Sequence, residues 1–230
     1  MKFDTRQLII VAIAVVVVVG GAFYFFNSRQ NSSVLEGATA DSAAAPAGTA
    51  AGQADSEIMV AGPLGEMGLG DPNAPNVVIE YMSLTCPHCQ AFHANTYDAF
   101  KEKYVDTGKV YFILREYPLD PLATAAAVLA RCAPADRFFP LIDLMFDRQR
   151  EWAFVQNPKA ALENLVKQAG ITPQMFEACL TNQQILDGVN WVKNRGTTEF
   201  GITGTPTFFV NGQELNGEKD LAAFDQMLGG

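Results

Sequence analysis

The sequence has little of what marks several common protein classes. It has no excess of positive charge, because 25 acidic residues outnumber 16 basic ones and the formal net charge is −9. A nucleic-acid partner is therefore not expected. It has two histidines and four cysteines, with a single C-x-x-C pair, whereas a structural zinc site needs about four ligands. A metal site is therefore not expected either.

Charge is absent from residues 8–26, "LIIVAIAVVVVVGGAFYFF". As a helix this run would cross roughly 28 Å of hydrocarbon, which predicts a single transmembrane helix after a short terminus, 1–7. Lys2 and Arg6 precede the run, so the terminus is expected in the cytoplasm and the rest of the chain on the other side of the membrane. A cleavable signal peptide is the alternative. Cleavage near Ala38 and Ala40 would then give a secreted form.

Large apolar side chains are scarce in residues 27–67, which include "GATADSAAAPAGTAAGQADS". Ala, Gly, Ser and Thr cannot bury enough surface to order such a segment, so it is predicted to be a flexible tether. With about forty residues, its reach would be roughly 35 Å. A folded head could thus work near the membrane.

Residues 68–228 have the patterns of a folded α/β domain. Strands are predicted over 76–84 and 109–118, with a helix between them that ends at Gly108. Helical patterns fill about 122–200. They are followed by a hairpin whose turn is Asn211 and Gly212, and by a closing helix over 218–228. This order predicts an α/β sandwich with a helical insertion.

The two cysteines of "TCPHC" lie where the first strand meets a helix start. Unpaired backbone N–H groups and the helix dipole stabilise a thiolate there, so Cys86 is predicted to attack and Cys89 to resolve the mixed disulfide. Pro87 suits the first helical turn because it has no N–H. A charged His88 would stabilise the thiolate further. A structural disulfide over so short a loop would gain only about 2 kcal/mol.

Several stretches together resemble the DsbA-type branch of the thioredoxin superfamily. They are "VVIEYMSLTCPHC", the helical insertion, "GTPTFFVNG" and the closing helix, and they cover residues 68–228. The stretches "REYPLDPLA" and "RCA" are similar to membrane-tethered or secreted bacterial members. The resemblance implies a thioredoxin-like fold.

The resemblance also implies roles for three further residues. Pro206 would be a cis-proline facing the CPHC site. Thr205 would offer its backbone to an extended substrate strand, a sequence-tolerant mode of recognition. Glu80 would be a buried acid that relays protons to the resolving thiol, although a solvated carboxylate at the sheet edge is the alternative. His93 is expected to be an ordinary packed or surface histidine.

Cys132 and Cys179 remain after the CPHC pair is assigned. They could be inert core cysteines. An oxidising location favours a structural disulfide between them, which would close a loop of about 48 residues and contribute about 4 kcal/mol.

The predicted function is thiol–disulfide exchange that introduces disulfides into exported polypeptides. No cofactor is expected, and the resemblance implies a quinone-linked membrane partner that reoxidises the protein. Two alternatives stay open. One is a disulfide isomerase or reductase, because Thr205 departs from the Val that strong oxidases of the family often carry. The other is a tethered holdase for unfolded chains, without enzymatic activity.

Overall fold

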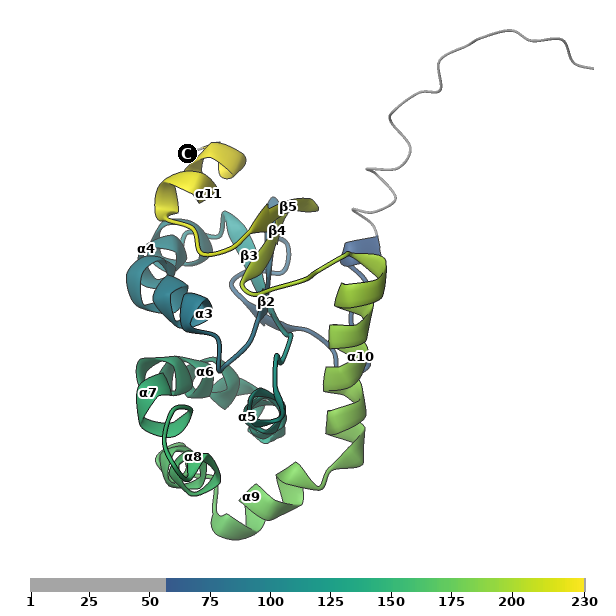
Figure 1. Ribbon diagram of the computed structural model, residues 1–230. Helices are drawn as coiled ribbons and strands as arrows, with labels where there is room; N and C mark the ends of the chain where they lie inside the picture. The colour runs from purple at the N-terminus through teal and green to yellow at the C-terminus, as the bar shows by residue number, and fades with distance from the viewer. Residues whose placement is uncertain (1–56, 230) are drawn as a thin grey trace, which may run out of the picture. The chain divides into compact units, whose positions relative to one another are not determined.

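The computed structural model describes residues 57–229 (Figure 1). The predicted terminus (1–7), membrane span (8–26) and most of the tether (27–56) lie outside these residues. Within the described part of the chain, no helix is long and apolar enough to cross a membrane.

The centre of the fold is a five-stranded sheet in the order β1-β3-β2-β4-β5. Its strands are β1 (Met67–Leu69), β2 (Asn76–Met82), β3 (Val110–Glu116), β4 (Thr207–Val210) and β5 (Gln213–Asn216). The central strand β2 pairs in parallel with β3 and antiparallel with β4. Both faces of β2 are covered, which explains why it is an almost continuous apolar run.

Alternate side chains of the sheet point into two cores. Val78 and Met82 pack in the larger core with Phe92, whereas Ile79 and Tyr81 pack in a second core on the opposite face. Figure 1 shows α3, α4 and α11 on one side of the strands and α10 on the other. The bounds are α3 (Pro87–Phe92), α4 (Asp98–Phe100), α10 (Gln183–Glu199) and α11 (Leu221–Leu228), and the π-helical turns η1 (His93–Tyr97) and η2 (Lys101–Val105) continue α3 and α4.

The helical insertion lies between β3 and β4. It consists of α5 (Pro121–Cys132), η3 (Ala135–Arg137), α6 (Phe138–Asp147), α7 (Gln149–Trp152), α8 (Pro158–Lys167), α9 (Pro173–Leu180) and α10. Polar side chains cap several of these helices: Asp120 accepts from the Ala123 N–H at 2.8 Å, and Asn182 caps α10 in the same way. The α/β fold with a helical insertion is thus confirmed. The helices of the insertion run over 121–199, close to the predicted 122–200, whereas β2 and β3 each end two residues before the predicted strands.

Residues 57–67 differ from the prediction, which placed them in the tether. Ile58 is buried in the second core, and the Arg195 guanidinium donates to the Val60 carbonyl at 2.8 Å. Leu64 lies so close to Gly188 that any Cβ there would come within 2.3 Å of it. Through these contacts the segment packs against the folded domain. The short strand β1, which was not predicted, begins at its end.

The carboxyl-terminal hairpin has the predicted turn. Asn211 and Gly212 have φ values of 49° and 83°, the left-handed conformations that a two-residue hairpin turn requires. The closing helix begins at Leu221 and not at 218, because the Asp220 side chain caps it by accepting from the Ala223 N–H at 3.1 Å.

Candidate active site

Cys86 is the residue that caps the start of α3, directly after the loop that leaves β2. Its extended backbone, with φ −78° and ψ 123°, turns the chain from the loop into the helix, while Pro87 occupies the first helical turn. The Cys86 carbonyl accepts the Gln90 N–H at 3.1 Å. Both thiols of the pair are free in the structure.

The surroundings of Cys86 lower its pKa to about 5. The largest cause is a hydrogen bond from the Cys89 thiol. Burial opposes it, but the Thr205 hydroxyl and the backbone N–H groups of Cys89 and His88 add to the lowering. Cys86 is therefore a thiolate at neutral pH, the reactive form in disulfide exchange.

The environment of Cys89 has the opposite effect. Its side chain is fully buried, and this burial raises its pKa well above the usual value, followed by the hydrogen bond with Cys86 and the charge of Glu80. Two thiols three positions apart thus differ strongly in acidity. One is poised to attack or leave as a thiolate, and the other holds its proton.

Glu80 lies behind this pair on the central strand. It is opposite Leu114 and Phe208 in the register and is fully buried, so the alternative of a solvated carboxylate at the sheet edge is wrong. Its Oε2 is 3.2 Å from the Nε2 of His93. Its Oε1 has no partner among the described residues, which is unusual for a buried carboxylate.

His93, expected to be an ordinary histidine, is the buried partner of Glu80. Its ring lies against Phe146, with centroids 4.2 Å apart, and against Tyr97 at 4.6 Å. Its Nδ1 also lacks a partner in the described part of the chain. The four-residue spacing from Cys89 placed it on the inner face of the helix, but only the fold shows that Glu80 lies opposite.

The His88 imidazole does not occupy the position that the sequence suggested. Its side chain is 71% exposed, and Nδ1 lies 3.6 Å from an oxygen of Glu218. The contribution of His88 to the lowered pKa of Cys86 comes through its backbone N–H.

Thr205 and Pro206 face the pair from the loop before β4. The peptide bond between them is cis. The Cys86 sulfur lies 3.3 Å from the Thr205 carbonyl oxygen, to which it donates when it is protonated. The Thr205 hydroxyl is buried without a partner among the described residues, so it is free to donate to a Cys86 thiolate.

Gln149 at the start of α7 is a site residue that sequence reasoning missed. Its buried amide donates to the carbonyls of Leu84 and Cys86 at 2.9 and 3.0 Å. The insertion also reaches this loop through Asp120, which accepts from the Thr85 hydroxyl at 2.5 Å. Nothing in the sequence pattern separates Gln149 from other glutamines, because the contact depends on how the insertion folds back.

Cys132 and Cys179 form a disulfide that joins the end of α5 to α9, with Cα atoms 5.8 Å apart. Both lie in or against the larger core. No group of three or more metal-binding side chains occurs in residues 57–229.

The thioredoxin family model matches residues 64–229 of the chain, most of its length. The crystal structure of Wolbachia pipientis alpha-DsbA1 superposes with a TM-score of 0.70 at 31% identity, over 76% of this chain and 94% of that one. The chain belongs to the DsbA branch of the thioredoxin family.

Curated relatives agree with this membership. This DsbA-like chain is 32% identical, over 148 residues, to a Rickettsia typhi protein described as a protein-disulfide oxidoreductase, covering 64% of the chain and 55% of that protein. It is 29% identical to the thiol:disulfide interchange protein DsbA of Pectobacterium carotovorum, over 64% of the chain and 72% of that protein. The chain thus spans about half the length of the Rickettsia relative.

Proposed function

We propose that this DsbA-like chain is a thiol:disulfide oxidoreductase that introduces disulfides into exported polypeptides through Cys86 and Cys89. The observation that carries the proposal is the opposite environment of the two thiols. The pKa of Cys86 is lowered to about 5, while that of the buried Cys89 is raised. Stabilising the Cys86 thiolate favours the reduced pair, and this makes the disulfide form an oxidant.

The exchange needs only the two sulfurs and the thiols of the client. A client thiolate attacks the Cys86 sulfur of the Cys86–Cys89 disulfide, so a mixed disulfide forms and Cys89 leaves and takes up a proton. A second client thiolate then attacks the client sulfur of the mixed disulfide. The client disulfide forms, Cys86 leaves as a thiolate, and two electrons have passed from the client to the protein.

Glu80 is the group that would exchange the proton of Cys89. Its charge acts on that thiol, and its free Oε1 is the only oxygen not engaged by His93. His93 is a positioning residue in this proposal, because its Nε2 fixes the carboxyl group in a site with no other partner among the described residues. Proton transfer by a positioned carboxyl group can accelerate such a step by about 10²-fold or more.

The client chain would lie beside the loop of Thr205 and Pro206. The Thr205 carbonyl is within hydrogen-bond reach of Cys86, so an extended client strand held there would present its sulfur to Cys86. Backbone pairing places few demands on client sequence.

The location and the electron partner are further parts of the proposal. The uncharged run over residues 8–26 would anchor the protein in the inner membrane with the head in the periplasm. A quinone-linked membrane protein would accept the two electrons from the reduced Cys86–Cys89 pair. Residues 27–56 would then let the head reach both this partner and its clients.

Incubating the oxidised full chain with a reduced, unfolded client that has several cysteines tests the proposed activity. Two client thiols should disappear for each Cys86–Cys89 pair reduced, and the Cys86→Ser variant should oxidise none. Client that stays bound with its thiols intact would favour a holdase instead. Faster reshuffling of a scrambled client than oxidation of a reduced one would favour an isomerase.

A further inference from the structure

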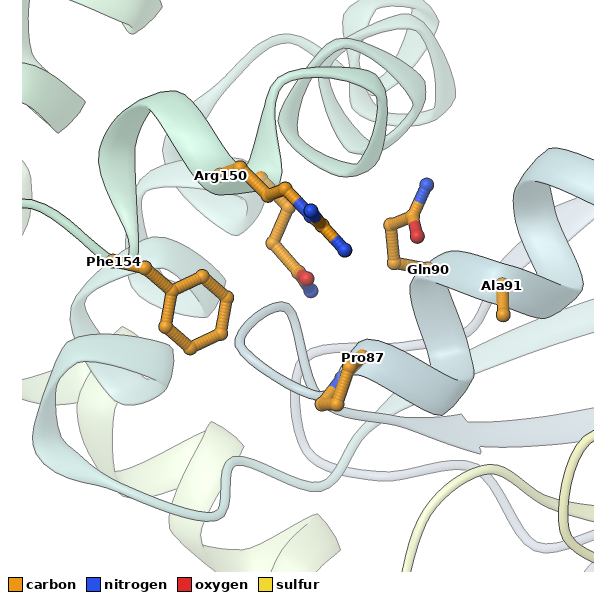
Figure 2. A pocket seen from close by; sticks show the side chains of 6 residues that line it. Pro87, Gln90, Ala91, Arg150 and Phe154 are labelled. Atoms are coloured by element: carbon orange, nitrogen blue, oxygen red, sulfur yellow. The ribbon is translucent and has the colours of Figure 1, made fainter.

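A groove of about 680 Å³ opens beside the helix that carries the reactive cysteine. One wall comes from α3, with Pro87, Gln90 and Ala91, and the other from α7 and the residues after it, with Gln149, Arg150 and Phe154. Figure 2 shows the side chains of Arg150 and Gln90 pointing toward one another across it, with the Phe154 ring at one side. The groove begins one residue from Cys86.

Arg150 gives the groove an exposed positive charge. Its side chain is exposed and forms no ion pair or hydrogen bond within residues 57–229, whereas its neighbour Arg148 pairs with Glu151 at 3.3 Å. A guanidinium presents a planar set of donors that matches a carboxylate. In a chain of net charge −9, this exposed guanidinium offers an acidic group of a ligand a site of opposite charge beside the reactive cysteine.

Phe154 gives the same groove an apolar surface. Its side chain is 60% exposed, and the adjacent Val155 is 39% exposed. A ring left in water beside a charged group is a suitable contact for an apolar or aromatic side chain of a partner.

Gln149 connects this wall of the groove to the reactive centre. Its side-chain amide donates hydrogen bonds to the Leu84 and Cys86 carbonyls, which fix the groove wall against the loop of Cys86. A ligand in the groove is therefore positioned with respect to the reacting sulfur, and not merely near it.

We propose that this groove is a specificity subsite for the client. It would bind a segment with a carboxylate side chain next to an apolar or aromatic one, the carboxylate on Arg150 and the apolar group on Phe154. The inference rests on the proposed function, because the client is held there while its sulfur is joined to Cys86. An extended chain advances about 3.4 Å per residue, and the groove begins beside Cys86, so the test places the two residues a few positions from the client cysteine.

The test uses the oxidised full chain and short two-cysteine peptides. One peptide carries Glu and Phe two and three residues from the first cysteine, a second carries Lys and Phe, and a third carries Glu and Ala. Each peptide is made in two versions, with the test residues before or after the first cysteine. The second-order rate constant for loss of peptide thiols is divided by that for reduced dithiothreitol with the same variant, which corrects for changes in the chemistry itself.

The wild-type protein should oxidise the Glu-Phe peptide about two- to fivefold faster than the Lys-Phe peptide, the size of effect expected of one exposed ion pair. Arg150→Glu should abolish or invert this ratio, and high salt should shrink it. Phe154→Ala should remove the advantage of Glu-Phe over Glu-Ala. The matched control is Arg137→Glu, an exposed arginine outside the groove, which should keep the wild-type ratios.

Equal oxidation rates for the three peptides would overturn the proposed subsite. The same change in the ratio of peptide rates in Arg150→Glu and Arg137→Glu would also overturn it. Equal rates are also the result expected if the groove binds a reoxidising partner and not clients. A protein that oxidises neither peptides nor dithiothreitol would instead contradict the proposed function, so the two failures are distinguishable.

Discussion

At the scale of single residues, the chemistry depends on which donors converge on Cys86. Four groups lower its pKa: the Cys89 thiol, the Thr205 hydroxyl and the N–H groups of Cys89 and His88. Two of these donors are backbone groups at the start of α3, and one comes from a loop that is distant in the sequence. The thiolate is thus stabilised mainly by hydrogen bonds and not by a neighbouring charged side chain.

Limiting alkylation of the reduced protein should label Cys86 and spare Cys89. The labelling rate should rise as the pH passes through about 5, where Cys86 ionises. Peptide mapping by mass spectrometry gives the site, and Cys86→Ser is the control. Label mainly on Cys89 would contradict the assignment of the attacking sulfur.

The same pKa predicts how the stability of the reduced protein depends on pH. A thiol with a pKa of about 5 when folded and 9.0 in the reference state binds fewer protons in the folded state between these values. The resulting stabilisation is therefore complete above about pH 9 and lost as the pH falls through 5. In urea unfolding, the free energy of unfolding of the reduced protein minus that of the oxidised protein should decrease as the pH is lowered from 8 to 5. A difference in unfolding free energy that does not change with pH would argue against a lowered Cys86 pKa.

His88→Ala should leave the pKa of Cys86 close to its wild-type value. The variant loses an exposed imidazole whose Nδ1 lies 3.6 Å from Glu218, while the backbone N–H of residue 88, which lowers the Cys86 pKa, remains. Titration of the ultraviolet absorbance of the thiolate measures the pKa in both proteins. A clearly raised Cys86 pKa in the variant would contradict this and would show that the imidazole itself stabilises the thiolate.

At the scale of elements, α7 supports the active-site loop through one side chain. Gln149→Leu would remove this donor from the Leu84 carbonyl and leave the Cys86 carbonyl with the Gln90 N–H alone. Burying such groups unpaired costs about 1–3 kcal/mol. The free energy of unfolding in urea should fall by this amount, and exchange at Cys86 should slow. Gln168→Leu, an exposed glutamine at the end of α8, is the matched control and should have little effect.

At the scale of the whole molecule, the Cys132–Cys179 disulfide secures the insertion. The bridge spans a sequence separation of 47, so its loss in the Cys132→Ala/Cys179→Ala variant should cost about 4 kcal/mol of unfolding free energy. Both cysteines should also resist alkylation after a mild reductant has opened the Cys86–Cys89 pair. Denaturant unfolding and mass spectrometry check the two statements. Equal stability of the variant and the wild type would show that the bridge is not a stabilising crosslink.

Much of the fold could be predicted from local patterns. The apolar run of β2, the helix before Gly108 and the Asn211-Gly212 turn each depend on residues within a few positions. The structure has all three, although the helix ends at Val105 and a turn leads to Gly108. The short strand β1 could not be predicted, because three residues at a sheet edge carry too weak a pattern. The packing of Ile58 and Leu64 was missed because the apolar residues of 57–67 show neither a strand nor a helix period, so the pattern predicts no packing without knowledge of their partners.

The sequence by itself determined the reacting pair and its place, because a C-P-H-C motif at the junction of a strand and a helix is a local feature. Only the tertiary structure decided what surrounds that pair. The family resemblance implied that Thr205, 119 residues away, faces Cys86, and the structure gives the contact. Gln149, 63 residues away, donates to the Cys86 carbonyl and was not expected. Glu80 meets His93 from another element. These contacts arise from the order of the strands and the return of the insertion onto the sheet, which the spacing of apolar residues along the chain does not encode.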